Sequence, residues 1–363
     1  MRHLRAGTRR LGKSRSLVLP RGPESLDPVS FGRRGPGARF SHEQLAHIAR
    51  TARRVPEVMV KVSGGGREAG AVQAHFSYIG RHGNLDLETD DGRRLAGEGA
   101  ARELVKDWDL DLSAGPYRKG RALEHYTPPK RPKDVHNIVL SMPAATPPKK
   151  LLAAAKAFAH NQFGDRHRYA MALHTDQQHP HVHLVVKAKS EQGDRLRISR
   201  ETLRAWREDF AKELRARGIA ANATTRAVRG QTKTPKKTPI HRAAMRGNST
   251  FMERLARDVG NEIRVGKLKP EPGRKSLHST RATVVREWEQ TAGRLDAQGE
   301  RLLAKDVRSF AANLPPPRTD RERVAAGILA EIVRREQRPR DLTRTSERLR
   351  APLRDPDPPE RSR

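Results

Sequence analysis

Several stretches of the chain carry apolar residues at every third or fourth position, the spacing of a helix with one buried face. Other stretches are short, apolar and rich in β-branched residues, which is typical of buried strands. These patterns predict helices over 41–53, 72–82, 97–108, 147–164, 199–218, 249–265, 276–295 and 319–337. They predict strands over 58–62, 134–142, 169–173 and 181–186, with a further short strand over 195–198. The middle of the chain therefore has the order strand, helix, strand, strand.

Polar residues in front of these helices indicate where each one begins. Ser199 is placed to cap the helix that follows it, and Thr319 with Glu322 has the spacing of a capping box. Thr146 is expected to cap a helix whose first position is Pro147, because proline suits the first turn.

The residues with the most chemical potential lie between two predicted strands. The segment 172–186 reads Ala-Leu-His-Thr-Asp-Gln-Gln-His-Pro-His-Val-His-Leu-Val-Val. Side chains alternate along a strand, so His181 and His183 face the same way while the apolar residues around them face the other. If 169–173 pairs antiparallel with the strand that begins at His181, His174 comes to lie beside the other two imidazoles.

Three converging imidazoles suit a metal ion, because neutral imidazole is the commonest metal ligand in proteins. A His-x6-His-x-His set on a rigid hairpin leaves coordination positions open for a substrate oxygen, as Lewis-acid catalysis requires. Asp176 could accept the second ring N–H of a ligand or receive a proton from a nucleophile. The alternative is a surface hairpin whose histidines bond only to water, but four histidines in ten residues favour a metal site. His179 has no assigned role.

The pattern His-x-Asp-x-x-His-Pro-His-x-His, followed by three apolar residues, resembles the third motif of the relaxases. These are the DNA-nicking enzymes of plasmid mobilisation and conjugation, within the HUH endonuclease superfamily, and the likeness is greatest to the branch that contains the T-DNA border endonuclease. The resemblance covers about Val58 to Gly230 and implies an α+β fold, a central antiparallel sheet with packed helices. It also implies a divalent metal ion, Mg²⁺ or Mn²⁺, held by the histidines, and a nucleophilic tyrosine nearer the N-terminus.

Tyr78 matches that expectation, because Phe-Ser-Tyr-Ile-Gly-Arg-His-Gly resembles the nucleophile motif of the family. In the predicted helix, Val72, Phe76 and Ile79 share the core face, whereas Tyr78 falls on a polar face with His75. A phenol, with a pKa near about 10, needs a base or a positive field to act as a nucleophile at neutral pH. The alternative is a tyrosine packed at the domain edge. Tyr117 and Tyr126 lie in a predicted loop and could stack on DNA bases instead.

The charge balance points independently to a polyanionic partner. The 363 residues carry a formal net charge of +32, with 35% hydrophobic and 4% aromatic residues, which fits one core domain plus less ordered material. Nucleic acid is favoured over a membrane surface, since the sequence shows neither an amphipathic anchor nor a long apolar run. Cysteine is absent, so thiolate sites and disulfides are excluded.

Composition, together with the resemblance, predicts five segments. Residues 1–54 are basic and rich in glycine and proline, and are expected to be mostly disordered apart from the helix that Ser41 could cap. Residues 55–230 form the relaxase-like domain, 231–247 a basic linker, 248–338 a helical region for DNA or a partner, and 339–363 a disordered, arginine-rich tail.

The prediction is therefore a relaxase that nicks single-stranded DNA at a plasmid transfer origin through a 5′-phosphotyrosyl intermediate. Its predicted catalytic residues are Tyr78 and Asp176, and its metal ligands are His174, His181 and His183. The resemblance implies relaxosome accessory proteins, a coupling protein of a secretion channel, no membrane insertion, and a cytoplasmic location with transfer to a recipient cell. The alternatives are a rolling-circle replication initiator, a hydrolase that uses metal-bound water, and a basic DNA-binding protein with an inactive site.

Overall fold

The computed structural model describes residues 39–110, 132–231, 238–267, 269, 271 and 273–337. Tyr117 and Tyr126 lie outside these ranges, as do the first 38 residues and the tail from 338 onward. By its internal contacts the chain forms two compact units, one within residues 1–229 and 287–313 and the other within 230–286 and 314–363. The five segments expected from the sequence remain a prediction.

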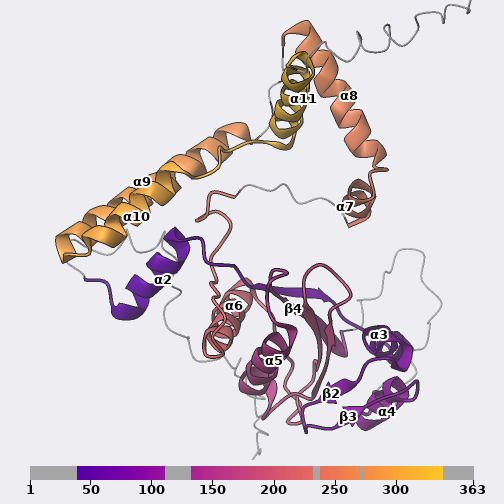
Figure 1. The fold of residues 1–363 in the computed structure, drawn as a ribbon. Coiled ribbons are helices and arrows are strands. Elements are labelled where there is room, and N and C mark those ends of the chain that lie inside the picture. The colour runs from indigo at the N-terminus through magenta and orange to yellow at the C-terminus, as the bar shows by residue number, and fades with distance from the viewer. Residues whose placement is uncertain are drawn as a thin grey trace, which may run out of the picture. The chain divides into compact units, whose positions relative to one another are not determined.

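The first unit is built on a six-stranded sheet with the order β1-β4-β6-β5-β2-β3, in which every pairing is antiparallel (Figure 1). The strands are β1 (Met59–Gly64), β2 (Leu87–Thr89), β3 (Arg94–Leu95), β4 (Val135–Ser141), β5 (Tyr169–His174) and β6 (His181–Lys187). Helices pack against this sheet, so the expected α+β fold with a central antiparallel sheet is confirmed. The two shortest strands, β2 and β3, were not predicted.

One face of the sheet is covered by α5 (Pro148–Phe163) and α6 (Arg200–Arg215). Val182 and Leu184 of β6 point into this core, where Phe158 packs edge-on against Trp206 and Phe210 at centroid distances of 6.3 and 5.8 Å. Because these apolar residues alternate with the histidines of β6, the core fixes which way the imidazoles face.

The opposite face is only partly covered, by α3 (Ala69–Ile79) and α4 (Ala100–Asp107). The predicted core face of α3 is confirmed, since Val72, Phe76 and Ile79 are all buried. Phe76 lies edge-on to Trp108, with ring centroids 5.2 Å apart. A short 3-10 turn, η1 (Arg81–Gly83), follows α3 and brings the chain to the end of β5.

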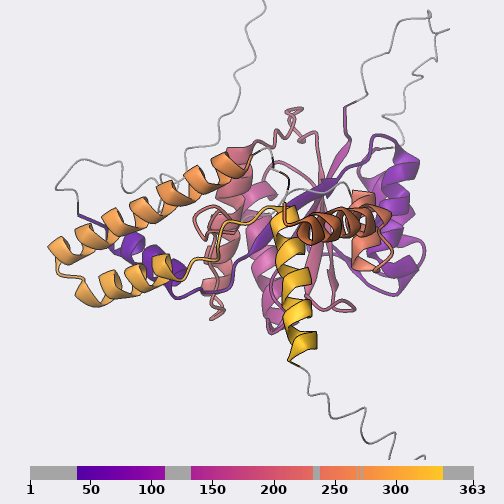
Figure 2. The same ribbon diagram turned by 90° about the horizontal axis from the view of Figure 1, so that it is seen from above.

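The N-terminal helix α2 (His42–Ala52) packs against α10 (Arg301–Ala312), which runs beside the C-terminal part of α9 (Arg274–Gln298) (Figures 1 and 2). Gln298 exchanges two hydrogen bonds with the backbone of Phe40, at 2.8 and 3.0 Å. On the other side of α2, Asn222 donates to the Thr51 hydroxyl at 3.1 Å. Residues 287–313, far along the chain from α2, thus belong to the first unit.

The second unit contains α7 (Thr238–Met245), α8 (Thr250–Val265) and α11 (Asp320–Glu336), with the N-terminal part of α9. The helices α8 and α11 pack together, and Arg321 forms an ion pair with the buried Glu262 between them. Neither α7 nor α10 was predicted from the sequence. No helix in the described part of the chain is long and apolar enough to cross a membrane.

The predicted caps have mixed outcomes. Ser199 caps α6, and Thr319 with Glu322 forms the expected capping box on α11. The prediction for Thr146 is wrong, because Pro147 is the N-cap, α5 begins at Pro148 and no side chain caps it. A residue that precedes a proline is disfavoured in the helical region, so Pro147 stays extended at ψ 119°.

The predicted strand over 195–198 is also wrong. Only Arg195 pairs, in a single bridge to Lys189 across a turn at Gly193. Both edges of β6, the strand just before this segment, are already occupied by β4 and β5, so residues 195–198 cannot pair along it.

Candidate active site

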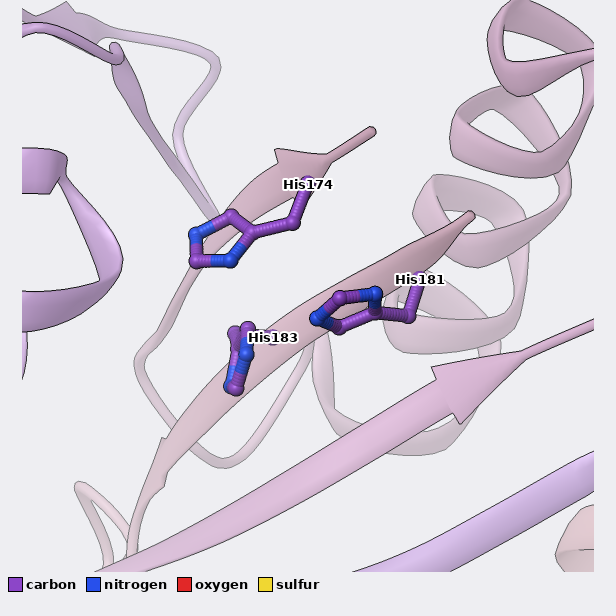
Figure 3. A group of neighbouring side chains, drawn as sticks. All are labelled: His174, His181 and His183. Carbon is purple, nitrogen blue, oxygen red and sulfur yellow. The ribbon is translucent and has the colours of Figure 1, made fainter. Parts of the chain in front are cut away.

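The hairpin of β5 and β6 brings three of the predicted site residues together. In its antiparallel register His174 lies opposite His181, and Ala172 lies opposite His183, so all three histidines face the same side of the sheet. Figure 3 shows their rings projecting from the two strands toward one another. Each ring offers a nitrogen that lies within 4.8 Å of the corresponding atom of the other two.

Backbone carbonyls determine which nitrogens remain for a ligand. The Nε2–H of His174 donates to the Ile79 carbonyl at 2.7 Å, and the Nδ1–H of His181 donates to the His179 carbonyl at 3.0 Å. Because a carbonyl only accepts, the ring lone pairs lie on Nδ1 of His174, which faces Arg81 at 3.1 Å, and on Nε2 of His181. Nδ1 of His183 is buried and has no hydrogen-bond partner. The donor set fits a divalent ion with open coordination positions.

Burial keeps two of these imidazoles neutral. It lowers the pKa of His183 to about 3, with further contributions from His174 and His181. It also lowers the pKa of His174, although the Ile79 carbonyl acts in the opposite direction. A neutral imidazole has the lone pair that a metal ligand needs. His179 lies exposed in the turn and contributes only its carbonyl to the cluster.

Tyr78 lies on the rim of this cluster. It is on the face of α3 opposite the core residues, and 47% of its surface is exposed. Its ring centroid is 6.1 Å from that of His183 in an edge-on arrangement, and 6.1 Å from that of His75 in a stacked one. The α3 helix and the β6 strand therefore place the tyrosine and the three histidines side by side.

Arg81 connects Tyr78 to the cluster. Its guanidinium carbon lies 5.5 Å from the centre of the Tyr78 ring, and one of its nitrogens donates to Nδ1 of His174 at 3.1 Å. The same nitrogen forms an ion pair with Asp176. The arginine has a positive φ of 51°, which is uncommon for a residue other than glycine.

Asp176 lies at this site, half-exposed, and contacts Arg81. The ring N–H groups of His174 and His181 go to backbone carbonyls, so the aspartate is not needed to orient those two rings. Its catalytic role stays a prediction.

Sequence reasoning did not assign His75 or Arg81 to the site. His75 is three residues before Tyr78, one helical turn away, and its buried Nε2 has no hydrogen-bond partner. The sequence alone could indicate this position, because residues three apart on a helix lie on the same face, and Tyr78 was expected on the catalytic face. Arg81 has no comparable signal, because its approach depends on the backbone turn after α3.

The part of the chain that contains the three histidines resembles a known protein family. Residues 116–218 match the family model described as "Relaxase: MobA/VirD2-like, nuclease domain". That match includes β4, α5, β5, β6 and α6, and with them all three histidines. Residues 116–218 are thus similar to the nuclease domain of that relaxase family.

The likeness to known proteins extends beyond the residues that match the family model. The protein is 29% identical over 202 residues to the T-DNA border endonuclease VirD2 of Rhizobium radiobacter, across 51% of this chain and 46% of that protein. It is 28% identical over 194 residues to the VirD2 of Agrobacterium fabrum, across 49% and 42% of the two chains. The chain thus matches a little under half the length of these relatives.

Proposed function

We propose that the protein is a DNA relaxase that nicks one strand at a plasmid transfer origin and stays covalently attached to it. The observation that carries the proposal is the position of Tyr78, whose ring centroid lies 6.1 Å from that of His183 at the edge of a three-histidine cluster. An exposed phenol beside a potential cation site is the arrangement that tyrosine transesterification requires.

In the proposed reaction the Tyr78 oxygen forms a bond to the scissile phosphorus while the bond between that phosphorus and the 3′ oxygen breaks. The products are a 5′-phosphotyrosyl link and a free 3′-OH. The phenolic proton passes to a nearby base, for which we propose Asp176, and the departing 3′ oxygen takes up a proton. The phosphodiester energy is kept in the new link, so the strand can later be rejoined without ATP.

The divalent ion, Mg²⁺ or Mn²⁺, would be held by His174, His181 and His183 and would supply charge stabilisation to the scissile phosphate. Imidazole ligands favour manganese and the later transition metals, whereas phosphate chemistry is commonly served by magnesium. Arg81 holds its guanidinium over the Tyr78 ring, 5.5 Å from its centre, beside the place where the scissile phosphate would bind.

Single-stranded DNA is the proposed substrate. The formal charge of +32 supports a nucleic-acid partner, and an exposed tyrosine on the rim is reachable by a strand that is free of its complement. A duplex encloses its bases, so a melted or extruded origin is expected, with relaxosome accessory proteins helping to supply it.

The similarity to the T-DNA border endonuclease VirD2 supports a role in DNA transfer between cells. On this proposal the protein acts in the cytoplasm and is passed with its bound strand to a recipient, with a secretion-channel coupling protein as partner.

The test is a denaturing gel. Protein is incubated with labelled single-stranded origin DNA and Mn²⁺ or Mg²⁺, and a denaturant-resistant adduct is scored. We expect the Tyr78→Phe change to abolish the adduct, because it removes the nucleophilic oxygen. Phe substitutions at Tyr117, Tyr126 and Tyr169 are the matched controls and should each leave the adduct in place.

A second pair of variants tests the histidines in the same gel. His181→Ala should lower adduct formation at least about 100-fold, a typical loss when a catalytic electrostatic group is removed. His179→Ala, an exposed histidine of the same hairpin, should leave it near the native level. Cleavage without an adduct would replace the proposal by a hydrolase that uses bound water, and binding without cleavage would leave a DNA-binding protein with an inactive site.

A further inference from the structure

Both ring nitrogens of His174 are engaged. Nε2 faces the Ile79 carbonyl at 2.7 Å, and Nδ1 faces a guanidinium nitrogen of Arg81 at 3.1 Å. A carbonyl cannot donate and a guanidinium cannot accept, so the ring proton sits on Nε2 and the lone pair of Nδ1 points at Arg81. The only nitrogen of His174 that could ligate a metal ion is the one that Arg81 occupies.

The guanidinium and a divalent cation are alternatives at this nitrogen. Both would take the same lone pair, and two positive charges a few Å apart repel strongly in a partly buried site. We infer that Arg81 is a positioning residue that holds His174 when no metal is bound and is released toward the DNA phosphate when a metal ion takes its place. This inference rests on the proposed metal site.

The backbone allows this exchange because it fixes the position of the Arg81 Cα atom, while the side chain beyond it can change rotamer. Arg81 and His82 have φ values of 51° and 55°, and the Arg81 carbonyl accepts from the Asn84 side chain at 2.9 Å. Such conformations persist only where their surroundings hold them. The guanidinium itself is partly exposed, and its other partner, Asp176, is half-exposed and can move with it.

The released guanidinium has a suitable new partner. It already lies against the Tyr78 ring, so a phosphate positioned for attack by that tyrosine would come within its reach. The planar fork of an arginine matches two phosphate oxygens. Metal binding would then free Arg81 for the phosphate, and phosphate binding would draw Arg81 away from the metal site. Each ligand would thereby favour the other.

Calorimetric titration with Mn²⁺ alone tests the exchange without reference to nicking. Without DNA, Arg81→Gln should bind Mn²⁺ about tenfold more tightly than the native protein, since a competing charge has been removed. Arg102→Gln, which removes an exposed arginine of α4, is the control for net charge and should bind like the native protein. Arg81→Lys keeps a positive charge at the position and should fall between the two, which preserves the test if Arg81→Gln does not fold.

The coupling is measured by repeating the titration with an oligothymidylate strand present, in a Tyr78→Phe background that cannot react. The strand should tighten Mn²⁺ binding when Arg81 is present and have a smaller effect in Arg81→Gln. Equal or weaker Mn²⁺ binding by Arg81→Gln would overturn the inference and leave the metal site standing. If the native protein and both Arg81 variants all fail to bind Mn²⁺, the proposed metal site falls and the inference falls with it.

Discussion

At the scale of single residues, burial decides what an imidazole can do in this protein. His47 of α2 is almost fully buried, and its Nε2 has no hydrogen-bond partner. Burial lowers its pKa to about 4, and the nearby Arg50 and Arg215 add to that effect. His174 is equally buried but has the Ile79 carbonyl at one nitrogen and Arg81 at the other. The first histidine is therefore purely structural, whereas the second is equipped to exchange partners.

The depressed pKa of His47 predicts a loss of stability in acid. Between about pH 6.5 and pH 4 the unfolded chain protonates this histidine and the folded chain does not, so the free energy of unfolding falls as the pH falls. A shift of this size amounts to about 2–3 kcal/mol near the lower end of that range. Urea denaturation of His47→Gln near pH 7 and near pH 4.5 should show a smaller decrease than the native protein. His42 is an exposed histidine of the same helix, so His42→Gln should show the native decrease. An equal decrease in the free energy of unfolding in all three proteins would contradict the lowered pKa of His47.

Some site residues were predictable and others were not, for a physical reason. The common direction of His181 and His183 follows from strand geometry alone, and the place of His174 beside them needs only a hairpin. The contact between Arg81 and His174 joins residues 93 positions apart and depends on a positive φ that no hydrophobic pattern signals. Its prediction would have required the tertiary structure.

At the scale of elements, α2 shows the limit of reading a segment by its composition. The surrounding sequence is basic and rich in glycine, and α2 has few strong apolar residues, so most of the segment was expected to be disordered. Ser41 nevertheless starts the helix with a full capping box, as its position had suggested. The partners of α2 lie far along the chain: α10 packs against the helix, and Asp306 of α10 pairs at 3.0 Å with Arg53, which follows α2. Local composition carries no information about them.

The burial of α2 can be tested through its apolar face. Ile48 is fully buried, so Ile48→Ala should lower the free energy of unfolding by about 2–5 kcal/mol through lost transfer energy and the cavity left behind. Leu45→Ala on the same helix is the control, and its effect should be smaller because Leu45 is only half-buried. Both are measured by urea denaturation. A loss below about 1 kcal/mol for Ile48→Ala would mean that α2 is detached from the first unit in solution.

Most long helices and strands were better predicted than the short strands, because each contains several repeats of the hydrophobic pattern. The register of β5 and β6 and the buried faces of α3 and α6 follow from alternation and helical spacing. The strands β2 and β3 have three and two residues, too few for alternation to be recognised. They form because their neighbours offer an edge to pair with, which is a property of the fold.

At the scale of the whole molecule, charge is the feature that affects every encounter with DNA. The net charge of +32 is spread unevenly, and residues 1–38 alone hold nine basic and two acidic side chains. Residues 339–363 hold seven arginines against five acidic residues, which leaves them much closer to balance. The proposed nuclease chemistry lies in neither segment. If the N-terminal segment contributes to function, its contribution is expected to be the strength of DNA binding and not the cutting of the strand.

Salt titration separates these contributions. For single strands the logarithm of the binding constant falls with the logarithm of salt concentration by about 0.7 for each phosphate neutralised. Removing residues 1–38 should therefore reduce the magnitude of that slope by about 2–4 if the segment contacts roughly three to six phosphates. Removing residues 339–363 should change it less, because their charges nearly cancel. Fluorescence anisotropy with a labelled oligothymidylate strand in metal-free buffer measures both slopes, and the position of the nick on origin DNA should be the same in all forms. An unchanged slope without residues 1–38 would mean that the basic residues from 39 onward supply the phosphate contacts, and that the net charge of the N-terminal segment has no part in binding.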